Sequence, residues 1–157
     1  MEADRFARGR NRAPERERRC AMHLPTQRLS TFLTFNGNAR EAMEFYAAAV
    51  PGARIESLAL FGEGAPNGDE GTVLNGSLSI GDANLLFMDM QAASPAPAFS
   101  WATSLFLACA DEDEFDRAFA GLSQDGAVMM GPEPVMDLRK VAWVTDRFGV
   151  TWQMVWD

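Results

Sequence analysis

Residues 28–52 read RLSTFLTFNGNAREAMEFYAAAVPG, a strand pattern that passes directly into a helix pattern. Apolar and polar side chains alternate over 28–36, as in a strand that is buried on one face. Asn38 is a favourable helix N-cap, and Glu41 follows three residues later, as in a capping box. The predicted helix, 39–49, places four apolar side chains on one face: Ala42, Phe45, Tyr46 and Ala49.

Three strands follow this helix, and the second half of the chain repeats the same order of elements. Strands are expected at about 53–61, 72–80 and 83–90, and residues 91–100, QAASPAPAFS, resemble a linker. A strand is then expected at 101–109, and Asp111 with Glu114 forms a capping box for a helix at 112–124. The last three strands are predicted at 127–134, 138–145 and 150–156.

The two halves of the chain can be overlaid on each other at a sequence offset of 73. This offset matches strand and cap positions: Thr31 with Ser104, and Asn38 with Asp111. An internal duplication is the simplest explanation of this agreement. We therefore expect an α+β fold made of two tandem βαβββ modules, at about 28–90 and 101–156.

Charge divides the chain into two compositions. The segment 1–20 holds seven arginines and four acidic side chains, a net charge of +3, so the segment 21–157 carries −11. We interpret residues 1–21 as a disordered arm, or as sequence upstream of a start at Met22, with one domain over 22–157. The acidic domain argues against nucleic acid as a partner, and no apolar run is long enough to cross a membrane.

The chain is poor in the residues on which several kinds of site depend. Its two cysteines, Cys20 and Cys109, exclude a disulfide framework and a CxxC zinc site, which fits a cytoplasmic location. Its one histidine, His23, excludes a site built on two or more histidines.

Two motifs resemble a known group of proteins. Residues 32–46, FLTFNGNAREAMEFY, and residues 144–153, VTDRFGVTWQ, are similar to the vicinal oxygen chelate superfamily, which holds glyoxalases, bleomycin-resistance proteins and extradiol dioxygenases. They are most similar to its PhnB-like branch, which carries a demethylubiquinone methyltransferase label. The resemblance implies a mixed sheet that curls around a cleft, with the helices outside, and it implies a homodimer.

Enzymes of this superfamily hold a divalent metal through one residue from each of four strands. Carried over by position, the resemblance puts these four residues here: Thr31, Leu86, Ser104 and Gln153. Only Gln153 is a familiar ligand type, and a neutral set does not offset the desolvation of a divalent cation. We therefore expect no metal ligands and no cofactor, with a divalent metal as the alternative.

The same positions suit a pocket for a small organic molecule. Thr31, Ser104 and Gln153 would supply hydrogen bonds. Apolar residues of the predicted strands would form the walls: Leu33, Phe35, Phe106, Leu86 and Val155. The competing interpretation is that all of these side chains belong to the core, with their polar groups bonded to backbone.

We expect a cytoplasmic protein that binds a small organic molecule between the modules without a tightly bound metal. One alternative is a metal-dependent lyase, isomerase or dioxygenase, and a second is a non-catalytic interaction dimer; the sequence leaves open whether the protein is an enzyme. Methyl transfer is not expected, because the chain lacks the glycine-rich turn and the parallel sheet with crossover helices that hold a methyl donor.

Overall fold

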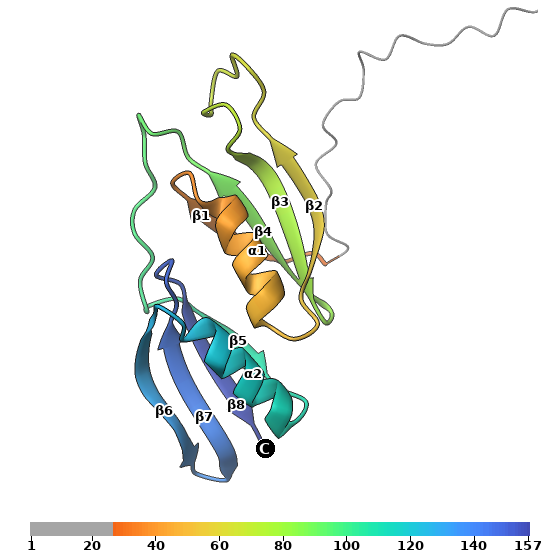
Figure 1. The fold of residues 1–157 in the computed structure, drawn as a ribbon, viewed down its shortest axis with the longest axis vertical. Coiled ribbons are helices and arrows are strands. Elements are labelled where there is room, and N and C mark those ends of the chain that lie inside the picture. Colours follow the sequence, from red (N-terminus) through yellow and green to blue (C-terminus); the bar gives the residue numbers. More distant parts are fainter. Residues whose placement is uncertain (1–26) are drawn as a thin grey trace, which may run out of the picture.

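The structure, a computed structural model, describes residues 27–157 (Figure 1). The predicted arm, the predicted start at Met22, Cys20 and His23 lie outside this range. The first module contains β1 (Thr31–Phe35), α1 (Ala39–Ala49), β2 (Arg54–Leu60), β3 (Val73–Ile80) and β4 (Ala83–Asp89). The second contains β5 (Ser104–Ala108), α2 (Glu112–Leu122), β6 (Ala127–Val135), β7 (Leu138–Thr145) and β8 (Thr151–Trp156). The predicted order of elements is confirmed, and the largest differences are that β1 begins at Thr31 instead of at Arg28 and that β5 begins at Ser104 instead of at Trp101.

The two modules have the same topology, as a duplication requires. The strand order is β1-β4-β3-β2 in the first sheet and β5-β8-β7-β6 in the second. In each sheet the first strand pairs in parallel with the last, and the other pairs are antiparallel. The expected α+β fold with mixed sheets is therefore confirmed.

Both helices lie on one side of the two sheets (Figure 1). We call this side of each sheet the covered face, and the opposite side the open face. The helices approach closely at Gly121, where a Cβ atom would lie 2.7 Å from the Cβ of Ala49. Glycine is therefore required at this contact. One hydrophobic core runs beneath both helices and includes residues of both modules.

Tyr46 joins the modules inside this core. Its ring lies 5.2 Å from the ring of Trp152 and 6.1 Å from that of Phe148, both in edge-on contacts. Burial and the nearby Asp146 carboxylate raise the pKa of Tyr46. Trp152 is 2% exposed and belongs to this core.

Asp146 organises the turn before β8. Its Oδ1 accepts the amide N–H groups of Phe148 at 2.9 Å and Val150 at 3.1 Å, and its Oδ2 accepts the indole N–H of Trp152 at 2.9 Å. Burial raises the pKa of Asp146, and these donors oppose the rise.

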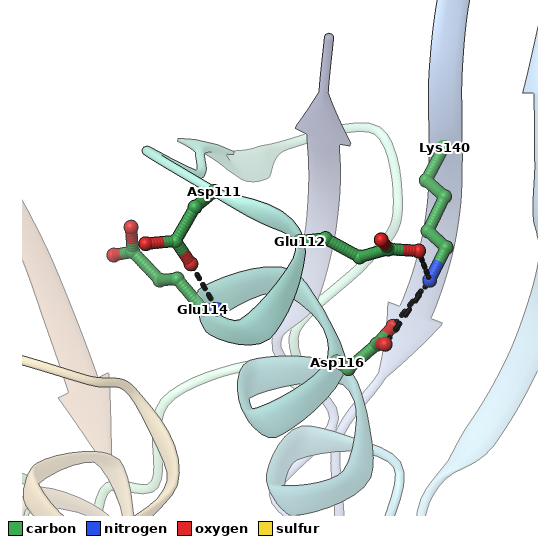
Figure 2. Close-up of polar contacts among 5 residues, drawn as sticks. All are labelled: Asp111, Glu112, Glu114, Asp116 and Lys140. Atoms are coloured by element: carbon green, nitrogen blue, oxygen red, sulfur yellow. Dashed lines mark hydrogen bonds and ion pairs between the residues drawn. The ribbon is translucent and has the colours of Figure 1, made fainter.

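The two helices are capped in different ways. Asp111 accepts the amide N–H of Glu114 at 2.8 Å, so the predicted cap of α2 is confirmed (Figure 2). The return bond differs from that of a capping box, because the Glu114 carboxylate accepts the amide N–H of Ala110, at 2.6 Å, and not that of Asp111. Asn38 is the N-cap residue of α1, but its side chain makes no capping bond.

Asp89, at the end of β4, supplies the cap of α1 instead. Its Oδ1 accepts the amide N–H groups of Gly37 at 2.8 Å and Ala39 at 3.0 Å, and its Oδ2 accepts that of Val73 at 2.9 Å. One buried carboxylate therefore ties the helix start to β3 and β4.

Lys140, on β7, forms ion pairs with two acidic side chains of α2. The Nζ of Lys140 lies 2.7 Å from Oε1 of Glu112 and 2.8 Å from Oδ1 of Asp116 (Figure 2). These ion pairs, together with the helix dipole, explain why acidic residues gather here. No helix among the described residues is long and apolar enough to cross a membrane.

Candidate functional site

The junction between the modules lies between two edge strands, β1 and β5. Each is the outermost strand of its sheet, and no strand pairing joins them within residues 27–157. Two cavities, of about 920 Å³ and about 630 Å³, occupy this junction. Thr31, Ser104 and Leu105 line both cavities, so the cavities meet where the two strands face each other.

The larger cavity combines apolar and charged walls. Leu85, Phe106 and Trp152 contribute apolar surface. Its charged lining residues come from two elements and one turn: Arg54 at the start of β2, Asp82 in the turn before β4, and Glu114 on α2.

The smaller cavity lies between β1 and the linker that joins the modules. Phe32 and Thr34 line one side, and linker residues 94–100 line the other. Two hydrogen bonds attach this linker to the end of β1: Asn36 Nδ2 donates to the Ala96 carbonyl at 3.1 Å, and the Ala96 amide donates to Asn36 Oδ1 at 2.8 Å. The linker is therefore a fixed wall.

Ser104 and Gln153 form a polar pair beside the cavities. Gln153 Nε2 donates to Ser104 Oγ at 2.7 Å. Trp152 and Met154 are buried on the covered face, so Gln153 between them lies on the open face. Phe106 pairs with Gln153 in the strand register, shares this face, and is 66% exposed.

Leu33 and Phe35 do not share the face of Ser104, Phe106 and Gln153. They are only 6% and 3% exposed, and they pack in the core beneath α1. Leu33 nevertheless also lines the smaller cavity, as the sequence predicts for a wall residue, whereas Phe35 lines neither cavity. The strand register explains the difference from the sequence prediction. Phe32 pairs with Leu86 as Phe106 pairs with Gln153, so Phe32 corresponds to Phe106 at an offset of 74.

The offset of 73 was therefore wrong for these strands, and an error of one residue moves each side chain to the opposite face. Thr31 points to the same side of β1 as Leu33, but it lies at the exposed end of the strand, where it lines both cavities. The structure thus brings together Thr31, Ser104 and Phe106 at the junction, with Gln153 attached through Ser104.

The corrected register also changes the residues at the superfamily's metal-binding positions. With Phe32 in place of Thr31 and Phe106 in place of Ser104, the carried-over positions form two cross-strand pairs on the open face, Phe32 with Leu86 and Phe106 with Gln153. Two phenylalanines and a leucine offer no donor atom to a cation, so this set does not fit a divalent metal. Within residues 27–157, no group of three His, Cys, Asp or Glu side chains is placed to hold a metal ion.

Sequence reasoning missed Phe32, Asn36 and the linker wall. The offset of 73 pointed to Leu33 and Phe35 as wall residues of β1, and so it passed over Phe32. The linker has no apolar periodicity, and the only signal for its wall was an amide, Asn36, directly after β1. Cys109, outside both cavities, is half-buried, and burial together with Glu114 and Asp111 raises its pKa to about 11.

Comparisons with known proteins agree with this architecture. A family profile described as 3-demethylubiquinone-9 3-methyltransferase matches residues 27–155. A Bacillus cereus structure with the same description, also called a PhnB protein, is 34% identical over 83% of this chain and 100% of that one, with a TM-score of 0.75. Protein PA1353 from Pseudomonas aeruginosa is 28% identical over 84% of this chain and 98% of that one, with a TM-score of 0.74.

A more distant structure shares the fold alone. It is a glyoxalase/bleomycin resistance protein from Albidiferax ferrireducens, 15% identical over 83% of this chain and 99% of that one, with a TM-score of 0.56. Among curated proteins, none matches the chain.

Proposed function

Because the chain belongs to the 3-demethylubiquinone-9 3-methyltransferase family, the PhnB-like branch of the vicinal oxygen chelate superfamily, we propose that it binds a small organic molecule between its modules. The binding site is the junction of β1 and β5, where the two cavities meet. The single observation that carries this proposal is that Thr31 and Ser104, from the first strands of the two modules, line both cavities.

The junction has the composition of a ligand pocket. Cavities of about 920 and 630 Å³ lie within the range that small-molecule sites occupy. Their apolar walls supply the hydrophobic contribution to binding, and the Thr31 and Ser104 hydroxyls supply hydrogen bonds at the place where the cavities join. Gln153 orients the Ser104 hydroxyl through its bond of 2.7 Å.

We propose further that the protein functions without a tightly bound metal. The donor set of Phe32, Leu86, Phe106 and Gln153 supports this, because it contains no carboxylate or imidazole. Elemental analysis of protein purified without chelators should show substoichiometric Mn, Fe, Co, Ni and Zn. One equivalent of metal that survives dialysis would contradict this part of the proposal.

Methyl transfer does not form part of the proposed function, despite the family description. A methyl donor such as S-adenosylmethionine is usually held at the ends of parallel strands with crossover helices. In the described chain each sheet has a single parallel strand pair, and the helices cover one side only. Specific binding of that donor, measured by calorimetry, would overturn this exclusion.

The binding proposal is tested by screening a fragment library with amide-resolved NMR. Fragments that bind should shift the amide signals of Thr31, Ser104 and Leu105 first. Ser104→Val removes the hydroxyl and keeps a strand-forming residue, and it should weaken the hits by about 1 kcal/mol. Ser57→Val is the matched control, because Ser57 is a strand serine that lines neither cavity. Shifts that gather elsewhere, or equal losses in both variants, would refute the proposed site.

We also propose that the protein forms a homodimer. Several large hydrophobic side chains are exposed on strands and loops: Phe32, Trp101, Phe106, Val128, Met129 and Met136. The edges of both sheets are likewise available for contact. Light scattering at micromolar concentration should give twice the chain mass of 17.2 kDa, and a monomer mass would contradict the proposal.

A further inference from the structure

We infer that the smaller cavity, between β1 and the linker, selects an uncharged and largely apolar ligand. This inference rests on the proposed function and names the chemical class of the ligand.

The smaller cavity offers hydrogen bonds but no charge. Among the described residues that line it, none is Asp, Glu, Lys, Arg or His. Its polar side chains are all hydroxyls: Thr31, Thr34, Ser94, Ser100, Thr103 and Ser104. A hydroxyl both donates and accepts, so this set suits the carbonyl, amide, ether or hydroxyl groups of a neutral molecule.

An ionised ligand would be poorly accommodated here. A carboxylate or phosphonate that enters the cavity loses its hydration and meets no cation among the residues described. The larger cavity differs, because Arg54, Asp82 and Glu114 line it. The two cavities share Thr31, Ser104 and Leu105, but they should therefore differ in whether they accept a charged ligand.

The wall of the smaller cavity is fixed before any ligand arrives. The paired bonds between Asn36 and Ala96 fasten the linker at 3.1 and 2.8 Å. Phe99 packs edge-on against Phe35, with ring centroids 5.1 Å apart, so the linker is also held by the core. A preformed apolar wall lowers the ordering cost of binding a flat apolar body.

The test uses two probes that differ in charge and share one ring system: 2-naphthamide, which is neutral, and 2-naphthoate, which is an anion at pH 7.4. Isothermal titration of the full chain should give an affinity for 2-naphthamide at least about tenfold above that for 2-naphthoate. Equal or tighter binding of 2-naphthoate, or binding of neither probe, would overturn the inference.

A charge introduced into the wall should reverse this preference. Thr103 is exposed, and it lines the smaller cavity but not the larger one. Thr103→Lys therefore places an ammonium group in the smaller cavity with little effect on folding. We expect 2-naphthoate to gain at least about fivefold in affinity and 2-naphthamide to lose affinity. Gln124→Lys is the matched control: it adds the same charge at an exposed site away from both cavities, and it should change neither affinity. Equal effects of the two lysines would overturn the inference.

The position of the bound probe separates this inference from the proposed function. Amide shifts should include Thr34, Phe99 and Thr103, which line only the smaller cavity. Shifts confined to Arg54, Asp82 and Glu114 would overturn the inference and leave binding at the module junction intact. If no fragment of any charge binds at the junction, the proposed function itself fails.

Discussion

Replacing Asp89 with alanine should destabilise the protein far more than the loss of an ordinary helix cap. Asp89 is 1% exposed, and its carboxylate accepts three backbone N–H groups from two segments outside β4. The Gly37 amide lies in an exposed turn, where water can replace the carboxylate. The amides of Ala39 and Val73 belong to fully buried residues and would be left without a partner.

The expected magnitude follows from those two buried donors. An unsatisfied buried donor costs about 1–3 kcal/mol, so the pair predicts a loss of about 2–6 kcal/mol. A domain of this size has a total stability of about 5–15 kcal/mol, so Asp89→Ala should leave the fold marginal. Asp89→Asn keeps one acceptor oxygen but turns an NH₂ group toward one of the donors, and it should cost about 1–3 kcal/mol.

Urea denaturation, followed by tryptophan fluorescence, measures these losses. Asp111→Ala is the matched control, because Asp111 caps α2 with one exposed bond and should cost about 1 kcal/mol. If Asp89→Ala costs no more than Asp111→Ala, then the buried amides find other partners and the reasoning is refuted.

Three further predictions concern single residues. Gln153→Leu should leave the free energy of unfolding within about 1 kcal/mol and weaken fragment binding by about 1–3 kcal/mol; unfolding with unchanged binding would show that Gln153 only supports the core through Ser104. With Cys20 replaced by serine, Cys109 should react with iodoacetamide slowly at pH 8 and faster toward pH 11, its raised pKa, and fast reaction at pH 8 would contradict this. Because the pKa of Asp146 is raised in the folded state, Asp146 contributes more to the free energy of unfolding at low pH, and this contribution decreases as pH rises above the ordinary carboxyl pKa of about 4. A ¹³C titration of its carboxyl group with a midpoint at or below that value would disprove the shift.

Local patterns predicted the elements of this fold well, because their causes are local. Asp111 caps α2 through the amide of Glu114, as their spacing indicates, since both partners lie within one helical turn. Asp146 closes its turn for the same reason, with partners at most six residues away. The strand and helix order of both modules followed from such patterns.

Long-range partners could not be predicted from one sequence. Asn38 has a favourable residue type for a cap, but Asp89, 50 residues from Ala39, takes that role. No spacing in the sequence indicates this pairing, because β4 reaches the start of α1 only after the sheet has formed.

In the candidate site, too, local features could be predicted from the sequence and long-range ones could not. The parity of β8 placed Gln153 on the opposite face from Trp152, as the structure shows. The alignment of β1 with β5 required a register known to a single residue, and low similarity between the halves left it one residue uncertain. Phe35, expected in the cleft, lies in the core, whereas Leu33 is a core residue that also lines the smaller cavity.

The different caps of α1 and α2 imply an order of events during folding. The cap of α2 closes a loop of three residues, so this helix can nucleate before any sheet exists. The cap of α1 needs a contact across 50 residues, between Ala39 and Asp89. The chain pays the entropy cost of closing this long loop only when β4 pairs beside β1. We therefore expect two modules of the same topology to have different roles in the transition state, with α2 structured early and α1 late.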